Sequence, residues 1–421
     1  MKALLKLGLV TLGLAVATAP SADAFSYLES VYGTQELGLS ARSKAMGGTG
    51  AAVGQGVYSL VDNPAAMLLA RGSRVQGLGV LARASENRFV PVFDTFDSFV
   101  DEAATAVNDD GYGALQGGVV LDRWGEKGVM VSAGIFNRYD PRYDFFNEIR
   151  TSENTDEIIA NQFIEVSGVI RSASVGAAWA PDANFGVGAA VNYYYGTVDT
   201  YNATIGRPDS NVDTETSRSE RKMDGVSVTL GGTARVDDRL QVGLSIETAP
   251  NLSDDRTVYT NGDPVDLADL ENGDVELPFR AQGGIAYRPR NTLKTTFAAD
   301  VVYTAWEDVT DYANPDLALN DTWGVRFGIE HVFYNELGGR LGFRFEESYV
   351  DEEADLSAFS FGFGYIVDTL HLNLAGEVGK RNSRQQPLTP RDHLSPRVGL
   401  GTDRVEDTLV RVSLGASYYF D

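Results

Sequence analysis

The chain has 421 residues, no cysteine, three histidines and a formal net charge of -24. Without cysteine it can form neither a disulfide framework nor a thiol site, and three scattered histidines disfavour a multi-histidine metal site. Nucleic-acid binding needs clustered Lys and Arg, so the acidic balance argues against that partner. We expect no cofactor and no metal.

The first 24 residues have the pattern of a secretory signal peptide. Lys2 and Lys6 precede an apolar run from Leu7 to Ala17, and Ala22-Asp23-Ala24 offers small residues for cleavage. The run is too short to span a bilayer as a helix. We therefore expect residues 1–24 to be removed and the mature chain to begin at Phe25. No later apolar run has spanning length, which excludes a helical membrane protein and leaves a soluble periplasmic protein or a β-barrel.

Residues 25–73 show no strand alternation and are rich in small residues. A glycine cluster between Ala45 and Gly54 precedes Asn63-Pro64-Ala65. The cluster superficially looks like a phosphate-binding loop, but no strand precedes it and no βαβ unit follows, so nucleotide binding is not expected. Small residues allow backbone to pack closely. We predict that residues 25–73 form an N-terminal plug inside a barrel lumen.

From residue 74 onward the dominant pattern is period-two alternation, which is typical of strands with two different faces. Val226, Val228 and Leu230 alternate with Ser227 and Thr229, and similar stretches recur to the end of the chain. A transmembrane barrel requires such segments, and its sheet must close because lipid offers no partner for a free edge. We therefore predict an all-β fold, a 14-stranded antiparallel transmembrane β-barrel over residues 74–421. The predicted strands are 74–84, 112–123, 128–138, 167–179, 185–197, 222–236, 240–249, 278–288, 292–304, 322–332, 340–349, 357–367, 369–380 and 403–420.

The connections alternate between short turns and long polar loops, as in barrels with short periplasmic and long extracellular connections. Long loops are expected at 85–111, 139–166, 198–221, 250–277, 305–321 and 381–402. Aromatic residues also gather at both ends of the strands, Trp306 and Tyr349 near long loops and Trp179 and Tyr287 near short turns. Two such belts match the girdles found at headgroup level. We predict a location in the bacterial outer membrane, surrounded by its lipid, with both termini periplasmic.

Several stretches resemble one family of outer-membrane proteins. Met46-Gly47-Gly48 is followed by Asn63-Pro64-Ala65, Leu277-Pro278 leads into a stretch that ends at Pro289, and the last strand is aromatic. In these features the chain resembles the long-chain fatty acid transporter (FadL/TodX) superfamily, which includes the PorV-like secretion-associated barrels. The resemblance implies a lumenal plug and a route by which hydrophobic ligands leave sideways into the membrane. The plug-motif residues are Met46, Gly47, Gly48, Gly50, Asn63, Pro64 and Ala65.

Two features depart from that family. The chain ends with Phe420-Asp421, whereas barrel-assembly signals commonly place the aromatic residue last. The predicted loop at 250–277 is strongly acidic, which is unsuited to gathering a fatty acid anion.

Two predicted loop segments are candidates for a hydrophobic capture site near the long loops. Each has apolar residues at a spacing that approximates one helix face, and Thr155 would cap the second helix. Local packing within the loops is the alternative, which we favour. The candidates are Phe93, Phe96, Phe99 and Val100 in the first segment and Ile158 and Ile159 in the second.

Many charged residues fall on the lumen-facing side of the predicted strands. An ion path would explain them, but their mixed signs favour mutually paired charges that brace the plug, because unpaired charges in a narrow lumen are costly. These residues are Arg235, Glu247, Asp300, Arg326, Glu330, Arg344, Glu346, Glu377 and Arg411.

Catalysis is not expected. The best candidate is Asp392-His393, and one Asp next to one His in the sequence is only a weak signal for a catalytic site. Two functions therefore remain. The first is an outer-membrane channel for hydrophobic small molecules, with the plug controlling passage. The second is a PorV-like scaffold that binds envelope or secreted proteins. Acidic loops favour the scaffold, and the aromatic loop segments favour the channel.

Overall fold

The computed structural model describes residues 26–35, 39–94, 96, 98–124, 128–150, 157–265, 273–290, 294–334, 336–389 and 401–420. The predicted signal peptide, Thr155 and Asp392-His393 lie outside these residues. No helix in the described part is long and apolar enough to cross a membrane. The same residues contain no group of three or more His, Cys, Asp or Glu arranged to hold a metal ion.

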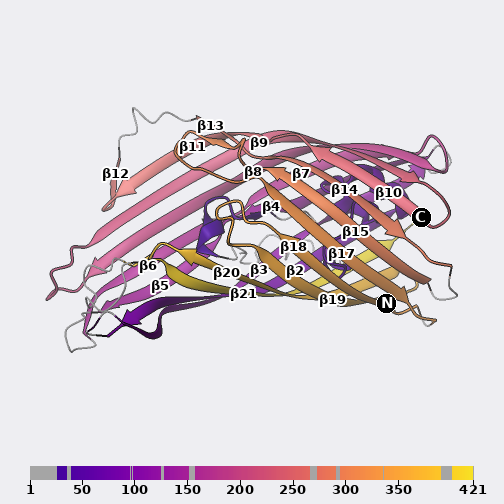
Figure 1. Ribbon diagram of the computed structural model, residues 1–421. Coiled ribbons are helices and arrows are strands. Elements are labelled where there is room, and N and C mark those ends of the chain that lie inside the picture. The colour runs from indigo at the N-terminus through magenta and orange to yellow at the C-terminus, as the bar shows by residue number, and fades with distance from the viewer. Residues whose placement is uncertain are drawn as a thin grey trace.

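The described chain forms a closed antiparallel β-barrel with fourteen wall strands, which confirms the predicted fold (Figure 1). Consecutive wall strands pair with each other, and β2 pairs with both β3 and β21, so the last strand closes onto the first. The strands are β2 (Arg74–Phe93), β3 (Phe99–Trp124), β4 (Val129–Asp140), β5 (Tyr143–Arg150), β6 (Ile158–Gly168), β7 (Ile170–Trp179), β8 (Phe185–Gly206), β9 (Glu215–Arg235), β10 (Leu240–Glu247), β11 (Asn251–Thr260), β12 (Asp263–Pro264), β13 (Gly273–Glu276), β14 (Phe279–Tyr287), β15 (Lys294–Ala305), β16 (Thr310–Asp311), β17 (Thr322–Val332), β18 (Gly338–Glu346), β19 (Leu356–Val367), β20 (Leu370–Gln385) and β21 (Asp403–Tyr419).

Four of the wall strands are interrupted, namely β4/β5, β6/β7, β10/β11 and β13/β14. Pro141, Pro250 and Pro278 lie at three of these breaks, where a residue without a backbone N–H cannot continue a ladder. At the fourth break Gly168 has a φ of +98°, a conformation that disfavours any side chain. The chain thus bends at defined points while remaining in the wall.

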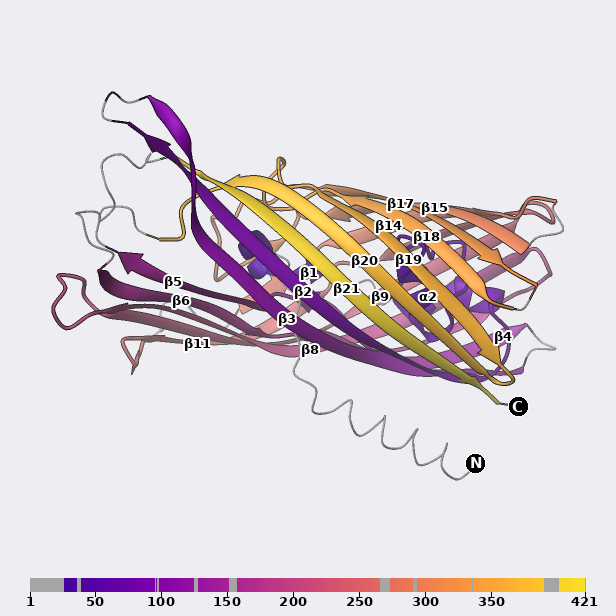
Figure 2. The same ribbon diagram turned by 90° about the horizontal axis from the view of Figure 1, so that it is seen from below.

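Several strands extend well beyond their predicted ends into segments predicted as long loops. β2 continues to Phe93 and β3 already begins at Phe99. β8 and β9 pair as far as Thr204 and Glu215. Beyond the bilayer both faces of a hairpin meet water, so the apolar alternation fades although the backbone ladder continues. These extensions form the long-loop end of the barrel, and Figure 2 shows the β2–β3 hairpin projecting there.

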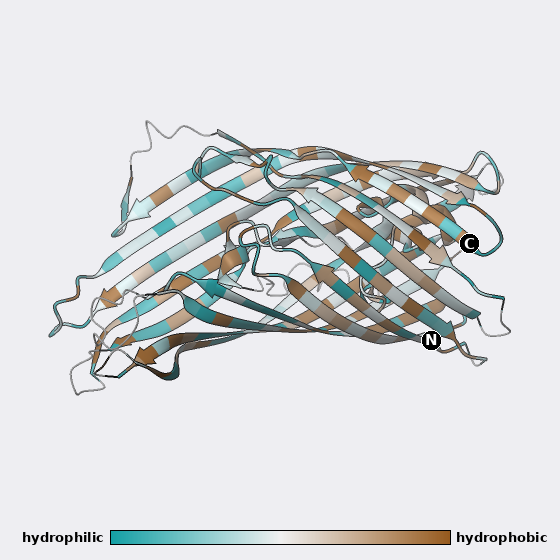
Figure 3. Cartoon of the chain, viewed as in Figure 1, coloured by the Kyte–Doolittle hydropathy of each residue, from teal (hydrophilic) through white to brown (hydrophobic). Residues whose placement is uncertain are grey.

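The two faces of the wall differ as the alternation predicts. Val226 and Leu230 are exposed on the outside, whereas Ser227 and Thr229 are buried on the inside. Figure 3 shows hydrophobic and hydrophilic residues alternating along the strands. An apolar exterior and a polar, filled interior are what a lipid-embedded barrel requires.

The aromatic belts are only partly as predicted. Trp179, Tyr287 and Trp323 are exposed on the outer surface. Trp306 and Tyr349 were expected in the outer belt, but both are buried and face the lumen. Each follows the end of a strand, where the alternation no longer determines on which side a residue lies.

Short helices make up most of the chain before β2. They are η1 (Tyr27–Ser30), α2 (Ala41–Lys44), η2 (Gly56–Leu60) and η3 (Pro64–Leu69), with the two-residue strand β1 (Thr34–Gln35) after η1. Ser40 caps α2 by accepting from the N–H of Ser43, and Asn63 caps η3 with Pro64 at the first helical position. These elements lie inside the barrel (Figure 2).

Candidate functional site

The residues from 39 to 69, which we call the lumenal segment, cross the inside of the barrel. Its η3 helix contacts β7, β8 and β9, η2 contacts β3 and β4, and α2 contacts β19, β20 and β21. The segment therefore bridges opposite sides of the wall, and the candidate site is this segment with the wall residues that hold it.

The glycine-rich motif packs against the wall through its backbone. Met46 is fully buried, and the N–H of Gly47 donates to Ser360 Oγ at 3.0 Å. Gly47 has a φ of +67°, and a Cβ there would lie 2.4 Å from the carbonyl oxygen of Phe343. The N–H groups of Gly50 and Ala51 donate to Asp300 Oδ2 at 2.6 and 2.9 Å. Small residues are thus required because backbone lies directly on backbone, and Gly48 in the same turn also has a positive φ.

The Asn63-Pro64-Ala65 motif fixes the start of η3. Asn63 Oδ1 accepts from the N–H of Ala65, while its Nδ2 donates to the carbonyl oxygens of Ala51 and Gly232 at 2.6 and 3.2 Å. One amide side chain therefore ties together the helix cap, the glycine-rich turn and β9. All three motif residues are buried.

Asp62 precedes this motif and is held by amide groups. Its carboxylate accepts from Gln55 Nε2 and Gln282 Nε2, both at 2.7 Å. Burial raises the pKa of Asp62, against the opposing effect of Arg280 and these hydrogen bonds.

Glu247 is the centre of one polar network in the lumen. It lies 2.7 Å from Arg138 Nη2 and 3.3 Å from Arg280 Nη2, and it accepts from Tyr194 Oη at 2.7 Å. Arg280 also donates to the carbonyl oxygen of Val61 in the lumenal segment. The network thus connects four wall strands, β4, β8, β10 and β14, to the segment.

A second network holds the opposite side of the segment. Glu330 pairs with Arg42 of α2 and with Arg340 of the wall. Arg326 donates to the carbonyl oxygen of Gly48 at 3.4 Å and pairs with Glu346. The remaining predicted lumen charges are chained by ion pairs, in the order Glu346, Arg344, Glu377 and Arg411. Arg235 differs from the others, because its side chain is exposed at the short-turn end.

Aromatic residues fill the long-loop half of the lumen, a feature that the sequence reasoning missed. Trp306 stacks on Tyr349 with ring centroids 4.0 Å apart and also contacts Tyr32 and Tyr139. Tyr194 lies next to Tyr139 at 6.3 Å. We call these five residues the aromatic cluster. Tyr194 falls on the predicted polar face of its strand, which is the signal that would have found it.

The wall beside this cluster is only partly paired. β3 and β4 pair from Trp124 and Val129 to Gly117 and Ile135, and their ladder stops there. Beyond that point β4 turns inward, since every residue from Phe136 to Asp140 is buried. We call this line the β3–β4 seam. The other wall strands pair along most of their length.

A piece of the N-terminal chain occupies part of this seam. Thr34 and Gln35 of β1 pair with Asp140 and Tyr139. Gly33 permits the approach, because a Cβ there would lie 2.0 Å from the backbone carbon of Asp140. Among the described residues no backbone hydrogen bond joins Phe99–Gly111 of β3 to β4 or β5. A contact between Asn108 Nδ2 and the carbonyl oxygen of Asp144 spans the seam.

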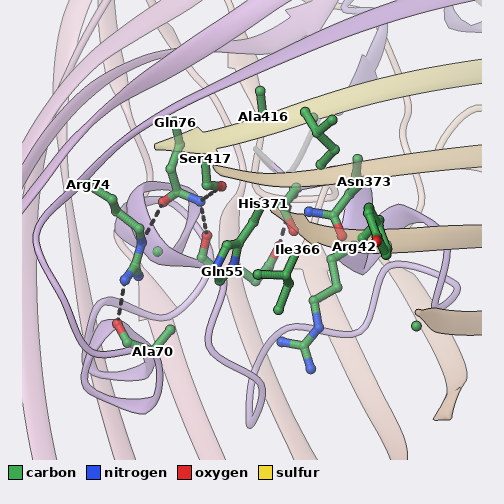
Figure 4. Close-up of a pocket in the computed structure, with 18 of the residues that line it drawn as sticks. Arg42, Gln55, Ala70, Arg74, Gln76, Ile366, His371, Asn373, Ala416 and Ser417 are labelled. Carbon is green, nitrogen blue, oxygen red and sulfur yellow. Dashed lines mark hydrogen bonds between the residues drawn. The ribbon is translucent and has the colours of Figure 1, made fainter. Parts of the chain in front are cut away.

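A polar cavity of about 280 Å³ lies at the short-turn end of the lumen (Figure 4). Arg42, Arg74, Gln76, His371 and Asn373 line it. Gln76 Nε2 donates to Ser417 Oγ at 3.0 Å, and Arg74 Nη1 donates to the carbonyl oxygen of Ala70 at 2.7 Å. The lumenal segment separates this cavity from the aromatic cluster.

The predicted helices of the hydrophobic capture site are wrong. Phe93 and Phe99 pair across a β-hairpin whose tip is held by Asp94, and Phe96 at the tip is 85% exposed. Val100, Ile158 and Ile159 lie on β3 and β6. Their spacing fits a helix, but β-branched and aromatic residues favour a strand when a neighbouring strand is available.

Three solved structures share the fold of this chain. They are a Pseudomonas aeruginosa FadL homologue (14% identity, TM-score 0.60, 91% of this chain and 98% of that chain covered), the Ralstonia pickettii toluene transporter TbuX (18%, 0.61, 91% and 99%) and the P. putida toluene transporter TodX (15%, 0.60, 91% and 99%). The resemblance to the FadL/TodX superfamily is thereby confirmed at the level of the fold. No curated protein sequence matches the chain.

A match at the level of sequence comes from one family. The BamG profile matches residues 129–403, which is more than half of the chain. The matched region runs from the first residue of β4 to the first residue of β21. It includes the Glu247 network and the wall residues of the second network except Arg411, and Arg42 of α2 lies before it. This protein therefore belongs to the BamG family.

Proposed function

We propose that this protein is an outer-membrane channel for hydrophobic small molecules, with its lateral exit at the β3–β4 seam. The observation that carries the proposal is the early end of the β3–β4 ladder beside the buried aromatic cluster. An apolar solute could move from this cluster into lipid by separating two strands that share no ladder there. The lumenal segment would close the remaining route toward the short-turn end.

The surroundings of the seam support this proposal. Tyr139 belongs both to the inward-turned end of β4 and to the aromatic cluster. The toluene transporters TbuX and TodX share the fold. We further expect the short turns and the C-terminus to be periplasmic, the usual arrangement in bacterial barrels.

A reversible cross-link across the seam tests the channel. The chain has no cysteine, so Asn108→Cys with Asp144→Cys introduces the only two thiols. Joining them with a reducible bifunctional reagent is expected to lower uptake of labelled toluene and oleate to the level of a deletion strain. Reduction should restore uptake, because the strands can separate again.

Cysteines at Asn382 and Glu406 provide the matched control. These residues already pair between β20 and β21, so a link there should leave uptake unchanged. Full cross-linking of the seam with normal uptake would contradict the lateral exit.

A scaffold that binds another envelope or secreted protein is the second candidate. The edge of β3 from Phe99 to Gly111 has only β2 as a strand partner among the described residues. Phe96, Phe99 and Val100 are exposed near it. A free strand edge with exposed apolar side chains suits strand addition by a partner chain.

The same cysteine pair separates the two candidates. A scaffold predicts no uptake of toluene or oleate above the deletion strain in any state of the cross-link. It also predicts that Phe99→Asp with Val100→Asp removes a co-purified partner without changing the folded barrel. Loss of uptake with unchanged partner binding would favour the channel.

A further inference from the structure

The cavity at the short-turn end has more cationic than anionic side chains on its walls. Its described lining contains three guanidinium groups and two carboxylates, those of Arg42, Arg74, Arg340, Glu330 and Glu336. With histidine neutral, three positive charges against two negative charges leave an excess of one positive charge. A cleft lined by an excess of one sign of charge concentrates the opposite ion, so the cavity favours an anion.

Arg74 is the lining cation without a charged partner. It is 1% exposed, and among the described residues no carboxylate forms an ion pair with it. It donates to the neutral carbonyl oxygen of Ala70 at 2.7 Å, and its guanidinium carbon lies 5.2 Å from the centre of the Tyr419 ring. Asp122 acts on Arg74 only from beyond ion-pair distance and pairs instead with Arg71 at 3.2 Å. Neutral partners satisfy the N–H groups of a buried guanidinium but leave its charge uncompensated.

The other two guanidinium groups share one carboxylate. Glu330 accepts from Nε of Arg42 and from Nε of Arg340, both at 2.8 Å. Arg42 also donates through Nη2 to Glu330 and through Nη1 to the carbonyl oxygen of Gly54. These contacts use three of the five N–H groups of Arg42, so two remain for a ligand. Its side chain is 29% exposed, and solvent therefore reaches it from the cavity.

Two neutral side chains add further hydrogen-bonding groups to the same wall. Asn373 Oδ1 accepts from Arg340 Nη1 at 2.8 Å, which leaves Nδ2 of Asn373 as a donor. The imidazole ring of His371 lies 4.4 Å from the Tyr419 ring and lines the cavity. Figure 4 shows His371, Asn373 and Arg42 close together, with Arg74 on the other side of the cavity.

We infer that this cavity binds a small monocarboxylate, held by Arg42, His371 and Asn373 in the field of Arg74. A carboxylate accepts several hydrogen bonds in one plane, which matches the planar guanidinium group. Its single negative charge balances the excess of one positive charge, whereas a phosphate dianion would exceed it. A volume of about 280 Å³ is far more than one water molecule needs, so an organic carboxylate can enter.

The site is independent of the β3–β4 seam, because the lumenal segment lies between them. It is therefore compatible with a channel and with a scaffold. Arg42 belongs to α2 of the lumenal segment, whereas His371 and Asn373 belong to β20 of the wall. A bound carboxylate would thus hold the segment to the wall at the short-turn end.

Binding of sodium benzoate to the purified full-length protein in a non-ionic detergent tests the inference. Isothermal titration calorimetry measures the affinity. Benzyl alcohol, which has the ring without the charge, and inorganic phosphate are the comparison probes. We expect saturable binding of benzoate, weaker binding of phosphate and no saturable binding of benzyl alcohol.

Two substitutions change the charge of the cavity in opposite directions. Asn373→Asp places a carboxylate beside Arg340, which the side chain already contacts, and should weaken benzoate binding about tenfold or more. Glu336→Gln removes an exposed carboxylate from the lining and should strengthen binding. Asn382→Asp is the matched control, because Asn382 is exposed on the same strand outside the cavity lining. Its affinity for benzoate should equal that of the wild type.

Protection of histidine from diethyl pyrocarbonate locates the site without any variant. Saturating benzoate should slow the labelling of His371, as followed by mass spectrometry. Labelling of His331, which lies outside the lining and contacts Thr295 at 3.0 Å, should not change. The inference is overturned by absent benzoate binding, by equal binding of benzyl alcohol, by tighter binding of phosphate, by unchanged affinity in Asn373→Asp or by unprotected His371.

Discussion

Replacing Glu247 with alanine is expected to cause the largest loss of stability of any single substitution in the lumen. The change leaves the guanidinium groups of Arg138 and Arg280 buried without their carboxylate. Removing one partner of a buried ion pair costs about 3–5 kcal/mol. It also frees the Tyr194 and Ser227 hydroxyls, which donate to Glu247. The measurement is the temperature at which the folded band on a gel converts to the unfolded band.

Asp199→Asn provides the control for this prediction. Asp199 pairs with Arg218 on the extended β8–β9 hairpin, where half of the Arg218 side chain is exposed. Exposed pairs contribute little because solvent screens them, so the conversion temperature should not move. If Glu247→Ala behaves like this control, the network does not hold the lumen together.

Replacing Gly243 with valine is expected to displace the lumenal segment and open the barrel. A Cβ at Gly243 would lie 1.9 Å from the carbonyl oxygen of Ala51, and backbone atoms cannot yield as a flexible side chain can. Valine is favourable in a strand, so the wall itself should still form. We expect a large rise in conductance in planar bilayers and in the sensitivity of cells to bulky antibiotics.

Gly77→Val is the matched control, because a Cβ at that position has no neighbour within 4 Å. It should leave conductance unchanged. A folded Gly243→Val barrel with unchanged conductance would show that the lumenal segment does not seal the pore.

The wall strands within the bilayer were predictable from the sequence. The predicted range 322–332 coincides with β17 (Thr322–Val332), and 357–367 is within one residue of β19 (Leu356–Val367). Lipid outside requires apolar residues and the lumen inside accepts polar ones, so apolar and polar residues alternate along each strand. This alternation involves only neighbouring residues and can therefore be recognised in a single sequence.

The segments outside the bilayer were harder to predict. The Phe93–Phe99 hairpin and the start of β6 were expected as helices, because their apolar residues fit a period near 3.6 by coincidence. In these segments water surrounds both faces, so the sequence shows no alternation. The strand forms because its backbone can pair with the adjacent strand. The inward positions of Trp306 and Tyr349 depend likewise on which way the chain turns after leaving the wall.

By itself the sequence determined the strand number, the order of turns and loops, and the small residues needed where backbone meets backbone. Parity along each strand also identified several of the charged side chains that face the lumen, although Arg138, Arg280 and Arg340 were missed and Arg235 is exposed. Only the tertiary structure decided which of these charges meet and where the β3–β4 ladder stops. These features depend on contacts between residues that are far apart in the sequence. A local sequence pattern does not show which of these residues come together when the barrel closes.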